Sequence, residues 1–572
     1  MAEEPCLVFQ SRASFTTELR GLALCTALTA LVYGRSLNFD FARTEELKLA
    51  DAMGRTDLAA LWGGLLMDPS RIAVEFSPLW RPVSNAMYLA AGWAGEGRAW
   101  AFHAVSMVGL VVLMWAARRT IGRRRGRDLV ALLIAFHPMT SAAVIDVSAL
   151  PLLWSAAWAV LAVTAAPRWA ALFTLLSIGC HEAGFVIPVI AAGIRRDANG
   201  HKRDPLRWLW PLGACTVGLA LGGLMRWSGL IASTAIGLPS TTGITEAAAH
   251  AWFYMARLFV PLFPVFARSP PEFPAPWPAF AWVFVLVVLF AVLRVRAPRD
   301  EPIGPGFAAG FCCVMLGLLA TGGMVSSIAG YGEDRLILPI VGLAWMLSSR
   351  PVGRSAGWAL LTAFVPLTFL RVEVWSAPVQ LWAESHRARP SDVMVSLEYG
   401  QRLVPIDPAM TVGLLEQVVA ADQGDETDFK ARVGLIQAWF ELGQDRRALP
   451  HLARIADPTD PRHSWLLVRR CILETRFGVD EEQYTTVAVK SSLASVCDEA
   501  SNRFPKDARL ANAAGLDAAG RGDTERAREL LKKAAELAPH NAEYRRSFSR
   551  MPMDMMGWHE DVPISPDPAA AP

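Results

Sequence analysis

The sequence predicts an all-α protein, in which a polytopic membrane helical bundle is followed by a soluble domain of helical repeats. Hydrophobic residues make up 53% of the 572 residues and charged residues 19%, against roughly 45–50% and about 25% in soluble domains. Long apolar runs alternate with short arginine clusters, and after Trp375 the pattern changes to polar helix pairs. Charges are sparse before Arg371 and dense after it, so an apolar part is joined to an ordinary polar one.

The apolar runs predict about eleven membrane spans, because a helix needs about 20 apolar residues to cross a bilayer and fewer when it is buried in a bundle. The pair 168–180 and 183–194 is short, and it predicts either a buried helical hairpin or one broken span. The runs cover 18–37, 99–117, 129–146, 149–165, 168–180, 183–194, 207–227, 278–294, 304–324, 335–349 and 356–371.

These runs divide the chain into a membrane domain at 1–375, a repeat domain at 376–550 and a disordered tail at 551–572. The loop 38–98 is long enough to carry a function. Residues 45–49 and 57–62 within it have the pattern of amphipathic helices on a membrane surface.

Four arginine-rich clusters orient the spans, because loops enriched in lysine and arginine face the cytoplasm. They lie at 118–127, 195–203, 294–299 and 350–354. All four clusters can lie on the cytoplasmic side only when the short pair 168–180 and 183–194 counts as two spans. The N-terminus is then cytoplasmic, and the loop 38–98 and the repeats lie outside. The Ala/Arg/Trp-rich composition favours a bacterial inner membrane, which makes the repeats periplasmic. No basic stripe interleaved with aromatics appears, so no nucleic-acid partner is predicted.

The polar region contains a repeat pattern of small residues. Gly522, Ala527, Ala534 and Pro539 are separated by five, seven and five residues. This spacing looks like a tetratricopeptide repeat, in which small residues let two helices approach closely. Gly443 and Ala448 repeat the first interval, and 391–420 is a candidate for a degenerate copy. Such repeats predict a protein or peptide partner; the alternative is that they brace the membrane domain.

The eight cysteines show no CxxC or Cys/His pattern with the spacing of a metal site. No metal is therefore predicted, and a divalent cation accompanying a substrate stays open. Cys471 and Cys497 could form a disulfide if the polar domain lies outside the cytoplasm, although nothing in the sequence fixes their separation.

Ionisable side chains at membrane depth are functional candidates, and on this topology five groups of them lie near the outer face. Each has a structural explanation when taken singly, such as a helix cap, a core histidine or an arginine that reaches the lipid interface. Together they suit a reaction on a lipid-linked phosphate, with a carboxylate as general base and cationic groups stabilising the phosphate. The groups are Asp40; Arg81 with His103; His137 with Asp146; His181 with Glu182; and Glu333, Asp334 and Arg335.

Five short motifs in order resemble a known family. They are SPLWRPV (77–83) running on to WAFH (100–103), FHPMTSAAV (136–144), HEAG (181–184), YGEDRLILP (331–339) and RVEVWSAPVQLW (371–382). The first resembles the "YRP…FH" segment of the C-type glycosyltransferases, and the others resemble their "HP…EAV", "KE…P", "ERYLYLP" and "W…LW" segments. The likeness is greatest to the transmembrane and tetratricopeptide-repeat O-mannosyltransferases and their bacterial relatives.

The resemblance implies an enzyme that moves a sugar from a polyprenyl-phosphate donor to an acceptor hydroxyl outside the cytoplasm. It implies Asp40 as the catalytic base, in the position of the family's acidic residue in the first outside loop. It assigns donor or phosphate binding to Arg81, His103, His137, Glu182 and Arg335, with His181, Glu333 and Asp334 in support.

The sequence departs from the family pattern at three places. Phe39 and Phe41 flank Asp40 where the family often has an adjacent acidic pair, His181 replaces a lysine, and Ala149-Leu150 stands where an arginine or lysine is expected. A non-catalytic scaffold whose repeats bind an envelope protein is therefore the rival hypothesis. A transporter is weaker, because the two halves show no symmetric pair of broken helices.

Overall fold

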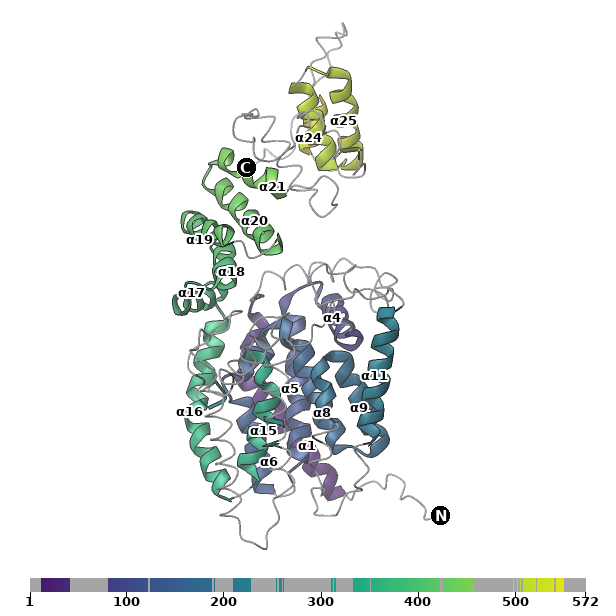
Figure 1. The fold of residues 1–572 in the computed structure, drawn as a ribbon, viewed down its shortest axis with the longest axis vertical. Helices are drawn as coiled ribbons and strands as arrows, with labels where there is room; N and C mark the ends of the chain where they lie inside the picture. Colours follow the sequence, from purple (N-terminus) through teal and green to yellow (C-terminus); the bar gives the residue numbers. More distant parts are fainter. Residues whose placement is uncertain are drawn as a thin grey trace, which may run out of the picture. The chain divides into compact units, whose positions relative to one another are not determined.

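The computed structural model describes residues 12–41, 81–121, 124–187, 190, 209–227, 254, 257–259, 261, 310–311, 313–314, 333–349, 351–421, 425–455, 497, 501–502, 505, 508–520, 522–539 and 542–549. Every regular element in these ranges is a helix (Figure 1), so the all-α prediction is confirmed for them. The chain forms two compact units, 1–399 and 400–572. The helices predicted at 45–49 and 57–62, the span 278–294, most of the span 304–324 and the tail 551–572 lie outside the described residues.

The helices of the first unit follow the predicted apolar runs closely. Short 3-10 turns join several of them: η1 (Gly34–Asn38), η3 (Val147–Ala149), η4 (Glu182–Val186) and η5 (Glu333–Leu336). The α-helices are α1 (Arg12–Tyr33), α4 (Pro82–Gly95), α5 (Ala99–Arg119), α6 (Arg124–Ala135), α7 (Thr140–Ile145), α8 (Leu150–Thr164), α9 (Pro167–Cys180), α11 (Leu209–Trp227), α15 (Ile337–Ser348), α16 (Pro351–Trp375) and α17 (Pro378–Ala388).

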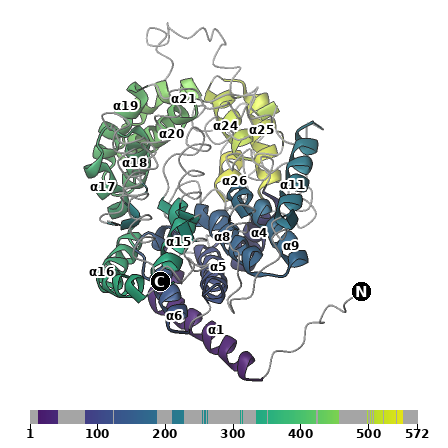
Figure 2. The ribbon, with the colours of Figure 1, turned by 60° about the horizontal axis from the view of Figure 1, so that its bottom comes forward.

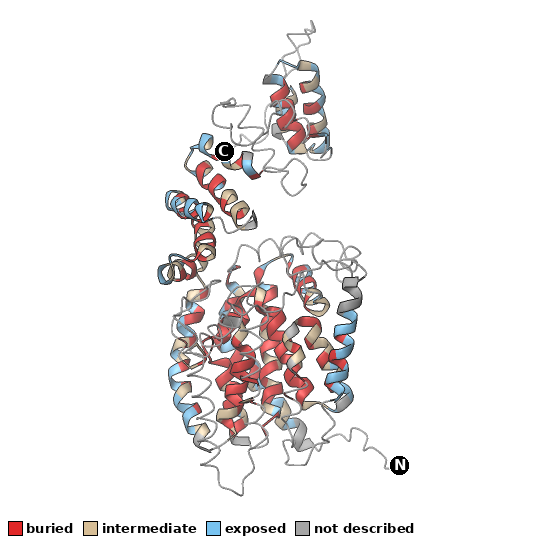
Figure 3. Cartoon of the chain, viewed as in Figure 1, coloured by how far each residue is buried: buried red, intermediate tan, exposed pale blue. Residues whose placement is uncertain are grey.

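Helix α5 is the centre of the bundle, where it packs against α1, α6 and α8. Outward from it, α9 packs on α8 and α11 on α9, while α15 packs on α6 and α16 on α15 (Figures 1 and 2). Two indole groups join α5 to its neighbours: Trp154 Nε1 donates to Val105 O at 3.2 Å and Trp345 Nε1 donates to Ala117 O at 3.0 Å. Most side chains of α8 and α15 are buried in this packing (Figure 3).

Three helices in the described part of the chain are long and apolar enough to cross a membrane by length and composition, where the sequence predicted about eleven spans. They are Ala99–Arg119, Val147–Thr164 and Gly353–Trp375. Four shorter apolar helices accompany them, at Arg168–Cys180, Leu209–Leu221, Ile337–Ser348 and Pro408–Ala420. Several predicted spans are therefore helices of 10–17 residues, which are shorter than the roughly 20 residues of an ordinary span.

The two outermost helices expose apolar side chains along their outer faces (Figure 3). On α16, Trp358, Phe369 and Leu370 are 40–65% exposed. Contiguous exposed apolar surface of this kind marks contact with lipid or with another protein. The corresponding residues of α11 are Leu209, Trp210, Leu212, Val217, Leu219 and Leu221.

The predicted continuous span 129–146 is wrong, because the helix breaks between α6 and α7. Pro138 has no N–H, and it disfavours helical backbone at the residue before it. The chain accordingly leaves the helix at Phe136 and resumes it at Thr140. All six residues of α7 are buried.

Side-chain hydroxyls satisfy the carbonyl groups at the end of α6, because buried backbone groups must find partners. Thr140 Oγ1 donates to Ile134 O at 2.8 Å, Tyr33 OH to Ala135 O at 2.8 Å, and Thr368 Oγ1 to Phe136 O at 2.6 Å. The three donors come from α7, α1 and α16. The break in α6 is therefore also the point at which three other helices are held together.

The second unit consists of antiparallel helix pairs. Helix α18 (Val393–Leu403) leads into α19 (Pro408–Ala420), α20 (Asp425–Glu441), η6 (Asp445–Ala448) and α21 (Leu449–Ile455). A further pair, α24 (Ala508–Gly520) and α25 (Thr524–Leu537), is followed by α26 (Ala542–Ser549).

The small residues of the predicted repeat lie where two helices meet. Ala527 and Ala534 of α25 are fully buried, and a Cβ on Gly515 would come 2.7 Å from Leu531 Cγ. Gly522 turns the chain with φ +81°, and Gly443 does so between α20 and η6 with φ +66°. The helix pairs predicted around both glycines are confirmed.

We expect Gly443→Ala to destabilise the second unit by about 1 kcal/mol, because an L-residue is strained at positive φ. Gly413→Ala is the matched control: it lies within α19, and its added Cβ would meet nothing within 4 Å. It should be neutral or stabilising by roughly 0.5–1 kcal/mol. Amide exchange of α19 and α20 in the whole chain measures both changes. Equal effects of the two substitutions would contradict the conformational argument.

A polar contact holds α21 against α20. Arg432 Nε donates to Asp428 Oδ2 at 2.7 Å, and Arg432 Nη1 lies 3.3 Å from His451 Nδ1. A guanidinium only donates, so Nδ1 of His451 is the acceptor and carries no proton. Burial and the positive charge of Arg432 lower the pKa of His451 to about 4, and Asp428 opposes this shift.

The stability of the α20–α21 pair should therefore depend on pH. A histidine pKa that is depressed in the folded state gives full stability above the unfolded value of about 6.5, and that stability is lost as the pH falls toward the folded value. Between pH 7 and pH 4.5 we expect a loss of about 1–3 kcal/mol, measured by amide exchange corrected for intrinsic rates. The same pH dependence in His451→Asn would show that another group is responsible.

Candidate functional site

The candidate residues lie at helix ends that the bundle brings to one side. Asp40 follows η1, His103 lies near the start of α5, and Arg335 lies in η5 before α15 begins. η1 packs on α5, η5 packs on α7 and α8, and α4 packs on α9. An exposed ion pair of 2.7 Å between Arg35 and Glu373 joins η1 to the last turn of α16. This is the end at which α16 leads into α17.

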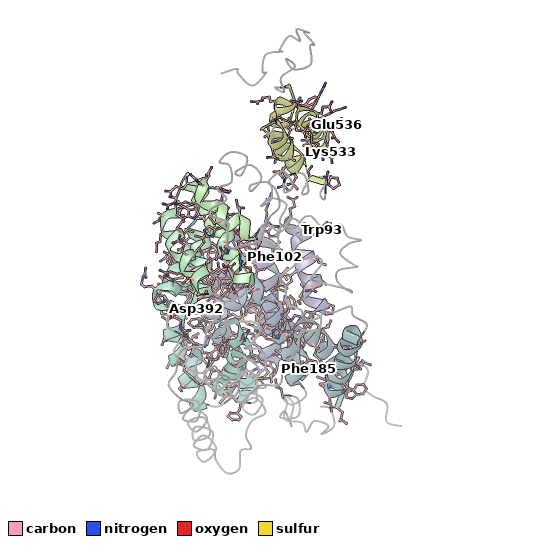
Figure 4. All side chains as sticks on the ribbon, turned by 45° about the horizontal axis from the view of Figure 1, so that its top comes forward. Trp93, Phe102, Phe185, Asp392, Lys533 and Glu536 are labelled. Atoms are coloured by element: carbon pink, nitrogen blue, oxygen red, sulfur yellow. The ribbon has the colours of Figure 1, made fainter. Side chains whose placement is uncertain are left out.

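Asp40 is exposed, while the phenylalanines on either side of it are buried. Phe39 is 8% and Phe41 4% exposed, and the Phe41 ring meets Phe102 of α5 edge to face at 5.7 Å. Phe102 lies inside the bundle in Figure 4. The Oδ1 atom of Asp40 accepts the Phe41 N–H at 2.8 Å. The two rings thus anchor the backbone on both sides of an outward-facing carboxylate.

His103 is fully buried behind Asp40. Among the described residues, neither ring nitrogen has a hydrogen-bond partner. The Phe39 main chain is close to the ring without meeting hydrogen-bond geometry, and the carboxylates of Asp40 and Asp146 act on it electrostatically. The structure therefore brings together two side chains, Asp40 and His103, that are far apart in the sequence.

Asp146 is the third member of this group; the sequence paired it with His137, whereas the structure places it within electrostatic reach of His103. It is 1% exposed, and its Oδ1 accepts the N–H of Ser148 at 2.9 Å and the Ser148 hydroxyl at 2.5 Å. Tyr88 OH donates to the next carbonyl, Val147 O, at 2.9 Å, which joins α4 to this turn. The sequence marks Asp146 as a candidate because it is a carboxylate within the long apolar stretch 129–165.

Both ring nitrogens of His137 are used by the backbone. Nδ1 accepts the Met139 N–H at 3.2 Å, and Nε2 lies 3.0 Å from Leu258 O. Because a carbonyl only accepts, Nε2 carries the proton. The ring also meets Phe364 at 4.8 Å between centroids. In this arrangement His137 holds the break after α6 and has no ring nitrogen left for a phosphate.

Arg81 and His181 come together where α4 begins and α9 ends. Arg81 is the residue before α4 and acts electrostatically on Cys180, the last residue of α9. Ser84 Oγ donates to Cys180 O at 3.4 Å. Nδ1 of His181 accepts the Ala183 N–H at 3.1 Å, which begins η4. The Glu182 side chain lies outside the described residues, as do those of Glu333 and Asp334.

Arg371 is a buried cation to which the sequence assigned no role. It is 3% exposed in α16, its Nε donates to Ser141 Oγ at 3.4 Å, and its charge acts on Tyr33 and His137. An arginine inside a predicted span was the available signal, because buried charges in such helices are costly. These partners place Arg371 at the break between α6 and α7.

Within the described ranges, no group of three or more His, Cys, Asp or Glu side chains is arranged so that it could hold a metal ion. The group around His103 instead combines an exposed carboxylate, a buried imidazole and a second carboxylate, while Arg81 acts on Cys180 and Arg371 on Tyr33 and His137. Carboxylates with an imidazole can move a proton, and arginines can bind an anion.

No family model matches the chain, and no curated protein matches its sequence. Among solved structures the chain is similar to the crystal structure of YrrB, described as a TPR protein with an unusual peptide-binding site. The identity is 15% and the TM-score 0.26, over 35% of this chain and 92% of that one. The resemblance to C-type glycosyltransferases stays a prediction.

The two buried histidines should differ in their contribution to stability. His137→Leu removes both ring nitrogens and so leaves the Met139 N–H and the Leu258 carbonyl without their hydrogen-bond partners. We expect this to lower the free energy of unfolding by about 2–4 kcal/mol. His103→Leu loses no hydrogen bond within the described residues, so it should cost less. Thermal unfolding of the detergent-solubilised protein measures both. A larger loss for His103→Leu would contradict the structural role of His137.

Proposed function

We propose that this protein is a membrane-embedded transferase that moves a sugar from a polyprenyl-phosphate donor to an acceptor hydroxyl. The observation that supports the proposal is the position of Asp40: an exposed carboxylate held between two buried phenylalanines and backed by the buried ring of His103. A general base needs such access to solvent together with a fixed direction. The five motifs that resemble the C-type glycosyltransferases favour the same chemistry.

In the proposed reaction, Asp40 takes the proton of the acceptor hydroxyl as its oxygen attacks the anomeric carbon of the sugar. The bond from that carbon to the phosphate oxygen breaks, and the polyprenyl phosphate leaves with the bonding electrons. Arg81 and Arg335 are the cations proposed to stabilise its charge. Glu182 remains a candidate for binding the donor, and His181, Glu333 and Asp334 remain candidates for supporting these groups.

We assign the two histidines different roles in this proposal. His103 lies within electrostatic reach of both Asp40 and Asp146, so it is suited to respond to the proton that Asp40 takes. His137 is assigned to scaffolding, because its ring nitrogens serve Met139 and Leu258.

We also propose that the protein lies in a bacterial inner membrane, with its N-terminus in the cytoplasm and its repeats in the periplasm. The apolar outer faces of α11 and α16 support membrane embedding. Arg118 and Arg119 at the end of α5 and Arg354 in the first turn of α16 lie at the opposite helix ends from His103 and Glu373, which supports the orientation.

The repeats are proposed to bind a protein or peptide partner. Ile406 and Met410, at the start of α19, are 64% and 43% exposed. Adjacent exposed apolar side chains of this kind are typical of binding surfaces. A partner recovered by crosslinking from a catalytically inactive variant would favour the scaffold hypothesis.

Asp40→Asn should reduce sugar transfer by about 10²- to 10⁴-fold, because the amide cannot accept the hydroxyl proton. Membranes that contain the variant are incubated with a radiolabelled polyprenyl-phosphate sugar, and incorporation into endogenous acceptors is measured. The expected change is in the rate of transfer, with donor retention by the membranes little affected.

Glu96→Gln is the matched control. Glu96 lies between α4 and α5 in the same region, and its side chain is 82% exposed in a contact with Arg98. This substitution should leave transfer unchanged. Wild-type incorporation by Asp40→Asn would remove Asp40 from the mechanism, and no incorporation by the unmodified protein from any donor would favour the scaffold.

A further inference from the structure

The cysteines of the two units differ in their chemical state. Cys497, in the second unit, is disulfide-bonded and 2% exposed. In the described part of the first unit, Cys25, Cys180 and Cys215 are free and buried. Cys497 packs in a small apolar core with Ala513 and Ala514 of α24 and Leu530 of α25.

We propose that the repeat unit carries a structural disulfide and matures in an oxidising compartment, which is then the compartment that the candidate site faces. The sequence holds one other cysteine after residue 400, Cys471, which lies outside the described residues. It is the partner expected for a bond within the unit. The inference does not depend on sugar transfer.

Formation of the bond requires an oxidant, and the proposal names its class: a disulfide-bearing thiol oxidoreductase. One cysteine of the chain, as the thiolate, attacks a sulfur of the oxidant's disulfide, forms a mixed disulfide and releases one oxidant thiol. The second cysteine then attacks the chain's sulfur in that mixed disulfide. This closes the bond within the chain and releases the second thiol, so two electrons and two protons pass to the oxidant.

The compartment follows from where such bonds persist. Disulfides are common in secreted and periplasmic domains and rare in the cytosol, where thiols are kept reduced. The burial of Cys497 protects the bond from exchange, because thiolates must reach a sulfur to break it. The position of Cys497 in a packed core argues against a transient or regulatory bond.

The same observation bears on the sidedness of the candidate site. None of the described helices after α16 is long and apolar enough to cross a membrane, and the apolar Pro408–Ala420 packs on α20. The segment 456–496 is rich in charged residues and has no apolar run of about 20. The end of α16 therefore shares the compartment of Cys497. The Arg35–Glu373 ion pair joins this end of α16 to η1, which directly precedes Asp40, so Asp40 faces the same compartment.

Peptide mapping of the wild-type protein tests the bond without any substitution. Membranes are denatured in N-ethylmaleimide to block free thiols, and the chain is digested with trypsin without reduction. We expect the peptide 471–476 linked to the peptide 491–503, and their separation on reduction. Cys497 alkylated in the unreduced digest would overturn the proposal, as would a Cys497 linked only to another molecule.

Two further measurements test the consequences. Cys497→Ser should lower the unfolding temperature of the repeat unit by roughly 10 °C, and reductant should do the same to the wild type and nothing to the variant. Cys215→Ser, at a free cysteine of α11, is the control and should keep the wild-type response to reductant.

Protease added to right-side-out spheroplasts should cut the repeats. Repeats cut only after lysis would overturn the compartment assignment, whatever the outcome of the sugar-transfer assay.

Discussion

In a bundle this apolar, a helix can be interrupted only where the backbone groups that it frees find new partners, and the interruption between α6 and α7 governs the rest of the first unit. Hydroxyl groups from α7, α1 and α16 take the carbonyls of Ile134, Ala135 and Phe136. His137 takes the Met139 N–H and the Leu258 carbonyl. A break imposed by one proline thus ties together helices that are far apart in the sequence.

The position of Asp146 depends on this break. A continuous helix through 129–146 would carry Asp146 along one face of a span, whereas the observed turn places it at the end of α7 with its carboxylate bonded to Ser148. From there it acts electrostatically on His103, as Asp40 also does. The Tyr88 hydroxyl donates to Val147 O in the same turn. This hydrogen bond fixes α4, the helix that begins after Arg81, against the turn that holds Asp146.

Apolar periodicity predicted most helix positions of the first unit, including α5, α8, α9, α11, α15 and α16 within a few residues at each end. The turn glycines and buried alanines predicted the helix pairs around Gly443 and Gly522 for the same local reasons. Length was predicted less well, because hydropathy does not show whether a short helix crosses the bilayer or packs inside a bundle. The partners of His137, and the nearness of Asp146 to His103, depend on tertiary contacts that no local pattern encodes.

The flanking phenylalanines of Asp40 bear on how such a site could work without an adjacent acidic residue. A second carboxylate beside Asp40 would raise its proton affinity by repulsion between like charges. Here the neighbours are buried rings, of which Phe41 packs on Phe102 of α5, and the second carboxylate near this group is Asp146, which like Asp40 acts electrostatically on His103. Because Asp146 is held by two bonds from Ser148 and Asp40 by one from Phe41, Asp146 is the fixed member of the group. Asp40 is the exposed member, as the proposed reaction requires of a general base.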